Sequence, residues 1–171
     1  MKKILISICL IVSLLVFGIS REGILEVMNY YNVNEDRAVI LTDELFNNSE
    51  GVDPEIMLAL MISEGGIKNV IGDHGEAMGY FQLHDCAIEY VTRFYPDVLE
   101  FYNSLNTIDD LLKFPAMQVK IACRYMYCLQ IFVCNGNLLK ALNLWNNSEN
   151  YYLRIFKIII FIHKNILREG N

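Results

Sequence analysis

The spacing of apolar residues constrains the fold of this chain more than any other feature. Apolar side chains recur every three or four residues almost throughout the sequence, and runs that alternate apolar with polar residues are scarce. An interval near 3.6 residues gathers side chains on one face of an α-helix, whereas a half-buried strand needs an interval of two. Only three prolines occur in 171 residues. The sequence therefore predicts one all-α domain, long enough to bury a substantial core.

Residues that start and end helices refine this prediction. The clearest start is Asp53-Pro54-Glu55, because an aspartate can cap exposed amide groups and a proline suits the first helical position. A pair of glycines beginning at Gly65 ends this helix, and a polar loop is expected over residues 68–79. The expected helices cover residues 24–31, 34–46, 54–64, 85–94, 115–133, 138–145 and 151–167.

Residues 1–20 form a separate unit in the sequence. Two lysines precede an uncharged apolar run that ends at Ile19, and small residues lie just before Arg21. A charged start, a short apolar run and a small-residue exit are typical of a secretory signal peptide. We therefore expect export to the periplasm or cell envelope, with the mature domain covering residues 21–171. An uncleaved N-terminal anchor is the alternative, although the run is short for a membrane span of about 20 residues.

Charge and cysteine content exclude some classes of function. The formal net charge is −6 and no basic run occurs, so nucleic-acid binding is not expected. Four cysteines follow the predicted signal peptide: Cys86, Cys123, Cys128 and Cys134. Export permits disulfides, whose pairing the sequence does not determine. Because no close Cys-x-x-Cys pair occurs and no histidine lies near the last three, we expect buried thiols or one structural bridge, and no metal or cofactor.

The segment 151–167 is a strongly apolar predicted helix. Its central run, residues 155–162, is membrane-like in composition, but charged residues from Arg154 to Arg168 interrupt or flank it. The run is also shorter than the roughly 20 residues that a bilayer requires. We expect a core helix, and the alternative is a helix that touches a membrane surface or a partner protein.

Glu64 is the strongest candidate for a catalytic side chain. It shares one helix face with Met57, Leu60 and Met61, at intervals of three, four and seven residues. A carboxylate on an apolar face is costly to ionise, and the negative end of the helix dipole adds to that cost. Both effects raise the pKa, as a general acid at neutral pH requires. A surface glutamate at a frayed helix end fits the same periodicity.

Four segments, taken in order along the chain, resemble motifs of the soluble lytic transglycosylase and lysozyme-like family. The segment 52–65 resembles the family's apolar catalytic helix, and 77–83 resembles its Gly-Ala-x-Gly-Leu-Met-Gln motif. The segment 118–126 resembles a helix of Asn-Ile then Tyr-Leu type. The segment 140–148 resembles the motif Ala-Leu-x-x-Tyr-Asn-x-Gly. The resemblance covers about residues 38–155.

The chain departs from these motifs at several positions. Ser63 precedes Glu64, whereas the family's glutamate comes before its serine. Glu76, Trp145 and Ser148 replace a glycine, a tyrosine and a glycine. A rival interpretation follows, in which the chain keeps the fold and binds glycan without cleaving it.

The resemblance implies a lysozyme-like helical fold with a glycan-binding groove. It also implies peptidoglycan as the partner and cleavage of the β-1,4 bond between N-acetylmuramic acid and N-acetylglucosamine. Glu64 would protonate the glycosidic oxygen and then accept a proton from the sugar's own 6-hydroxyl, leaving a 1,6-anhydro end. The implied substrate-binding positions are Met78, Gly79, Tyr80, Phe81, Gln82, Trp145 and Asn146.

Each of these positions has an expected role. Gly79 would let the saccharide approach the backbone, and Gln82 would offer its amide to the sugar. The alternatives are that Gly79 serves only a turn and that Gln82 hydrogen-bonds a loop backbone. Tyr80 and Phe81, with Met78 as a softer wall, would line the groove; the alternative is that Tyr80 and Phe81 are core aromatics. Asn146 would contact sugar. Trp145 replaces a tyrosine whose hydroxyl helps to hold the glutamate in the family. An indole can donate a hydrogen bond but cannot accept one, so a purely packing role fits Trp145 equally well.

Two further alternatives remain open at the level of sequence. A hydrolytic lysozyme would use a second carboxylate near the groove, for which Glu76 and Asp73 are the candidates. A structural component of an envelope-spanning secretion or conjugation complex could dock through the C-terminal helix. His74 and His84 are expected to be solvated, and the alternative is that they bind the peptide or carboxylate groups of the substrate.

Overall fold

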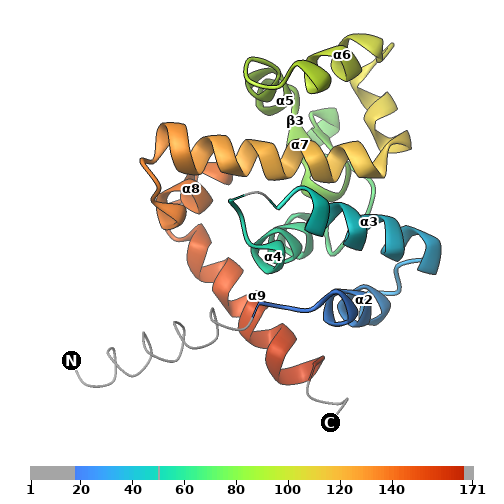
Figure 1. Cartoon of the computed structure of the whole chain (residues 1–171), viewed down its shortest axis with the longest axis vertical. Coiled ribbons are helices and arrows are strands. Elements are labelled where there is room, and N and C mark those ends of the chain that lie inside the picture. Colours follow the sequence, from blue (N-terminus) through green and yellow to red (C-terminus); the bar gives the residue numbers. More distant parts are fainter. Residues whose placement is uncertain (1–17, 50, 168–171) are drawn as a thin grey trace.

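The computed structural model describes residues 18–49 and 51–167, and most of the predicted signal peptide lies outside them. The described residues are mostly helical, as the apolar spacing predicts (Figure 1). The α-helices are α2 (Arg21–Tyr30), α3 (Glu35–Asn47), α4 (Pro54–Gly65), α5 (Asp85–Thr92), α6 (Pro96–Ser104), α7 (Pro115–Cys128), α8 (Leu138–Trp145) and α9 (Tyr151–Asn165). In Figure 1, α7 crosses the middle of the molecule, with α5 and α6 on one side and α2, α3 and α4 on the other.

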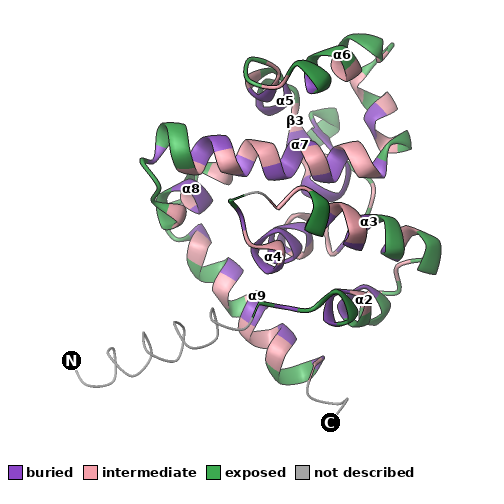
Figure 2. Cartoon of the chain, in the orientation of Figure 1, coloured by how far each residue is buried: buried purple, intermediate pink, exposed green. Residues whose placement is uncertain are grey.

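Helix α4 lies at the centre of the core (Figure 2). Every residue from Glu55 to Met61 is buried, so the helix is apolar on all sides and not only on the face that carries Glu64. Its ends are those expected from the sequence. Asp53 accepts a hydrogen bond from the backbone N–H of Glu55 at 2.8 Å, and Gly66 closes the helix in the left-handed conformation, with φ of 63°. Helices α3 and α9 pack against α4.

Helix α9 packs along α4 and makes side-chain contacts with both ends of α4. Ile155, Ile159 and Ile162 are buried between them. Near the C-terminus of α9, His163 Nε2 lies 2.6 Å from Oε1 of Glu55, whose side chain is only 2% exposed. These contacts confirm that α9 is a core helix. No helix among residues 18–49 and 51–167 is long and apolar enough to cross a membrane.

A small antiparallel sheet begins within the segment expected to be a polar loop and extends beyond it to the start of α5. Its strands are β1 (Ile71–Gly72), β2 (Ala77–Met78) and β3 (Leu83–His84), with 3₁₀ helices η1 (Asp73–Gly75) and η2 (Gly79–Phe81) between them. The pairing places Ala77 opposite both Gly72 and His84. Strands of two residues are too short to show a two-residue alternation, so periodicity could not reveal them.

Helix α6 and the 3₁₀ helix η3 (Ile108–Lys113) were also not expected. Pro96 begins α6, just as Pro54 and Pro115 begin α4 and α7. The sequence predicts one long helix over residues 115–133. In the structure α7 ends at Cys128, and the chain continues as a π-helical turn, η4 (Leu129–Val133). At the other end of the described chain, the Ser20 hydroxyl caps α2 at Gly23 N, 3.1 Å away.

The four cysteines are free thiols in this structure. Cys123, Cys128 and Cys134 are buried, in line with the expectation of buried thiols, whereas Cys86 is exposed. Burial raises the pKa of the Cys123 thiol to about 12, so this side chain behaves as an inert core residue.

Candidate active site

A cleft of about 500 Å³ opens beside the C-terminal end of α4. The small sheet, the start of α5, helix α7 and the end of α8 form its other walls. Its lining residues are Glu64, Asp73, Ala77, Gln82, Leu83, His84, Cys86, Ala87, Tyr125, Trp145, Asn146 and Asn147. Five of the candidate catalytic and substrate-binding residues, among them Glu64, therefore meet around one cleft although they lie as far apart as residues 64 and 146.

Glu64 lies in the last turn of α4 and is half-buried at the edge of this cleft. Burial is the largest influence on its carboxyl group and raises its pKa. A hydrogen bond from Tyr151 and the positive charge of Arg154 act in the opposite direction, but the net shift is upward. The carboxyl group thus retains its proton at higher pH than an ordinary glutamate, as a general acid must.

Tyr151 holds Glu64 in place from the first turn of α9. Its hydroxyl donates a hydrogen bond to Glu64 Oε1 and lies 3.0 Å from Ser63 Oγ. Burial and the neighbouring carboxylate raise the pKa of this tyrosine, so the hydroxyl stays protonated and remains a donor. Arg154, one turn further along, donates to the Ser63 carbonyl at 2.7 Å. The last turn of α4 is therefore tied to the first turn of α9.

Trp145 lines the cleft and packs edge-on against Phe81, with ring centroids 6.4 Å apart. Its ring centroid is 5.3 Å from that of Tyr125, which also lines the cleft. Trp145 also lowers the pKa of Glu64, a smaller influence than that of Tyr151. The tyrosine that holds the glutamate is Tyr151, which the sequence analysis missed because nothing links it to Glu64 until two helices far apart in the chain pack together.

Three residues expected to line the groove are core residues instead. Met78 and Phe81 are fully buried and Tyr80 is only 5% exposed. Met78 belongs to β2, and Tyr80 and Phe81 belong to η2, which packs against α4 and α7. The alternative interpretation of Tyr80 and Phe81 as core residues is the correct one. Met78 is a core residue as well, which corrects its expected role as a wall of the groove.

Gly79 and Gln82 serve the structure of the site. Gly79 has φ of 75°, and a Cβ added there would lie 2.0 Å from Oε1 of the buried Gln118. The close approach at Gly79 is therefore made by Gln118, not by a saccharide. Gln82 lines the cleft, but its amide group donates to the carbonyls of Val70 and Gly79, at 3.1 and 2.8 Å. Its donors hold the backbone around the small sheet, as the alternative interpretation of Gln82 predicts, which corrects the expectation that they face a sugar.

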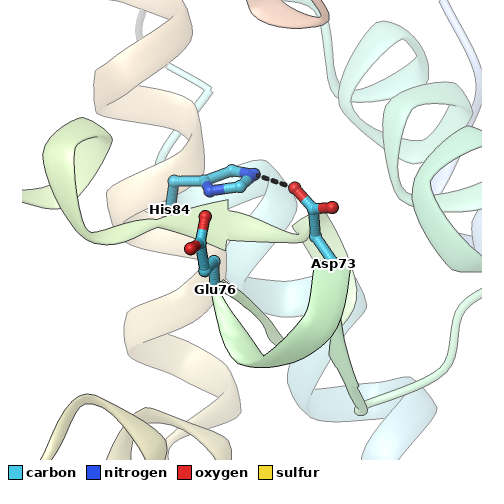
Figure 3. Close-up of side chains that lie close together, drawn as sticks. All are labelled: Asp73, Glu76 and His84. Atoms are coloured by element: carbon cyan, nitrogen blue, oxygen red, sulfur yellow. Dashed lines mark ion pairs between the residues drawn. The ribbon is translucent and has the colours of Figure 1, made fainter.

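Asp73 and His84 lie on the sheet side of the cleft, and Glu76 lies beside them (Figure 3). His84 Nε2 is 3.4 Å from Asp73 Oδ2. Both candidate second carboxylates are thus near the cleft, but of the two only Asp73 lines it. His84 is half-exposed and faces Asp73, whereas His74 is exposed. Asn146 lines the cleft next to Trp145, where the resemblance places a sugar-binding residue.

Comparisons with known proteins add nothing to this geometry, since no family model, curated protein or solved structure gives a significant match.

Replacement of Tyr151 by Phe tests its role as a positioning residue. The variant loses the donor to Glu64, so the pKa of the carboxyl group should rise further. Glu64 then keeps its proton to higher pH, so for an enzyme that uses this carboxyl group as its acid the basic limb of the pH–activity profile should move upward. The loss of orientation should lower kcat on the order of tenfold. Tyr152→Phe is the matched control, because only its backbone N–H makes a hydrogen bond, to Asn143 Oδ1. An unshifted basic limb would show that Tyr151 acts only in packing.

Proposed function

We propose that this protein is an exported peptidoglycan lytic transglycosylase with Glu64 as its catalytic acid. One observation carries the proposal: a half-buried carboxyl group with a raised pKa stands at the edge of an open cleft and is held by a tyrosine hydroxyl. The order of the four family-like segments and the signal-like residues 1–20 support it. On this proposal, the helical domain has a lysozyme-like fold and the cleft is its glycan groove.

The proposed reaction requires one carboxyl group in two protonation states. The Glu64 carboxylic acid donates its proton to the glycosidic oxygen, and the bond from that oxygen to the anomeric carbon breaks. The resulting carboxylate accepts the proton of the 6-hydroxyl as that oxygen bonds to the same carbon, and Glu64 regains its acid form. Tyr151 is suited to this cycle because its hydroxyl stabilises the carboxylate that exists between the two steps.

The walls of the cleft also suit a saccharide. Trp145 and Tyr125 present aromatic surface, while Asn146 and Asn147 offer amide groups. A mixture of aromatic surface and a few polar groups is typical of sites that bind small molecules. Phe81 supports Trp145 from below, so the aromatic wall rests on the core.

Asp73 favours a second candidate function, that of a hydrolytic lysozyme. It lines the same cleft as Glu64, and its side chain is 60% exposed, so a water molecule could reach it. A second carboxylate of this kind activates water in inverting glycosidases, which release a reducing end.

Mass spectrometry of fragments released from purified peptidoglycan separates these functions. Fragments with 1,6-anhydro-muramyl ends would support the transglycosylase, whereas ends heavier by one water would support the hydrolase and assign the second carboxylate to Asp73. Wall binding without any release would refute both and favour a non-catalytic glycan-binding module.

A further inference from the structure

The small sheet formed by β1, β2 and β3 brings three metal-ligating side chains to one edge of the cleft. Asp73 belongs to η1, Glu76 follows it, and His84 is in β3 (Figure 3). One ligand atom from each lies within 4.8 Å of the other two. The backbone pairing of Ala77 with His84 fixes this arrangement, because it places the end of β3 beside the residue that follows Glu76. Paired strands hold these side chains more rigidly than an irregular loop would.

The spacing of the atoms fits a bridging cation better than a direct ion pair. Nε2 of His84 and Oδ2 of Asp73 are 3.4 Å apart. A charged hydrogen bond between such atoms is normally about 2.7–2.9 Å long. Two ligands of a tetrahedral Zn²⁺, each about 2.0–2.2 Å from the ion, are separated by about 3.3–3.6 Å. The observed separation falls in that range, and a carboxylate oxygen of Glu76 lies within 4.8 Å of both atoms.

The carboxyl groups in and beside the cleft also favour a bound cation. Its lining includes the carboxyl groups of Glu64 and Asp73 but neither lysine nor arginine. Glu76 adds another carboxylate beside Asp73. Clustered carboxylates repel one another and concentrate cations in a concave site. Asp73 and Glu76 are exposed and His84 is half-exposed, so a hydrated ion has a direct path to all three.

We propose that Asp73, Glu76 and His84 form a binding site for a divalent transition-metal ion of the Zn²⁺ class. The imidazole selects against Mg²⁺ and Ca²⁺, which take oxygen ligands, while the two carboxylates lower the charge of the bound ion. Three protein ligands leave one position open toward the cleft, where water or an anionic group of a bound molecule can coordinate. The site does not depend on the proposed transglycosylase activity, because it involves neither Glu64 nor Tyr151, but it shares Asp73 with the hydrolase alternative and lies in the same cleft.

Isothermal titration of the chelator-treated full chain with zinc chloride tests this site. We expect one equivalent to bind and the melting temperature to rise with zinc concentration. His84→Ala and Glu76→Gln should each weaken binding by at least about tenfold. The matched control is His74→Asn, which removes a nearby exposed histidine and keeps a residue that tolerates its φ of 55°. Absence of binding to the wild-type chain, or equal binding by His84→Ala, would overturn the proposal.

A second measurement separates this site from the thiols. Cys86 also lines the cleft and is free, so it could capture zinc on its own. Cobalt(II) titration distinguishes the two, because a bound thiolate gives an intense charge-transfer band that carboxylate and imidazole ligands lack. We expect no such band and unchanged zinc affinity in Cys86→Ser. A strong thiolate band, lost in Cys86→Ser together with the binding, would assign the metal to the cysteine and refute the site proposed here.

Discussion

The Glu64→Gln variant should release fragments from peptidoglycan roughly 10²- to 10⁴-fold more slowly than the wild-type protein. Glutamine keeps the shape of the side chain and can still accept the hydrogen bond from Tyr151, but it has no proton to transfer. Initial rates of fragment release measure the effect. Glu89→Gln, an exposed change on α5, is the matched control and should keep full activity. Unchanged rates in Glu64→Gln would remove Glu64 from the mechanism.

The same variant should be more stable than the wild-type protein at neutral pH. Burial raises the pKa of Glu64, so the folded protein holds this proton more tightly than the unfolded chain does. The ionised carboxylate therefore costs stability above the folded-state pKa, and this cost disappears once the pH falls below the ordinary value of 4.5. Glutamine is neutral throughout. The melting temperature of Glu64→Gln should exceed that of the wild type at pH 7, and the two should converge in acid. A gain that persists below pH 4.5 would contradict this origin.

Gly79→Ala should lower the free energy of unfolding by about 3 kcal/mol or more. The new methyl group would lie 2.0 Å from Gln118 Oε1, at a backbone φ of 75° that alanine rarely adopts. Gln118 cannot simply move away. It is fully buried, accepts from the backbone N–H of Tyr80 at 2.9 Å, and donates to the Leu111 carbonyl at 2.9 Å. Breaking these contacts leaves polar groups buried without partners. Denaturant unfolding followed by circular dichroism measures the loss.

Gly66→Ala separates the clash from the backbone strain. Gly66 also has a positive φ, of 63°, but a Cβ there would meet nothing within 4 Å. This variant should lose only about 1–2 kcal/mol, the cost of a left-handed conformation in an L-residue. If both variants lose the same free energy of unfolding, the clash with Gln118 contributes nothing beyond the backbone strain.

The helices were predictable because their signals are local. The 3.6-residue spacing and the start signal at Asp53 act within a few residues, so the expected helix over residues 54–64 agrees with α4 to within one residue. The sheet was not predictable, since its strands have two residues each and are held by pairing partners and turn conformations such as the left-handed Asp73. Pro96 shows an intermediate case: it starts a helix, but the residues after it have too weak a pattern to reveal α6.

The sequence by itself predicted a helical chain and the bounds of α4 to within one residue, and it favoured a core helix over residues 151–167. Only the tertiary structure decided which side chains face the cleft. In the folded protein, Met78, Tyr80 and Phe81 are buried, and Gln118 lies in the space beside Gly79. Tyr151 is the residue that hydrogen-bonds Glu64. The physical reason is that helix formation depends on residues three or four apart, whereas a site depends on which distant helices pack together. Burial, and with it the raised pKa of Glu64, exists only after that packing.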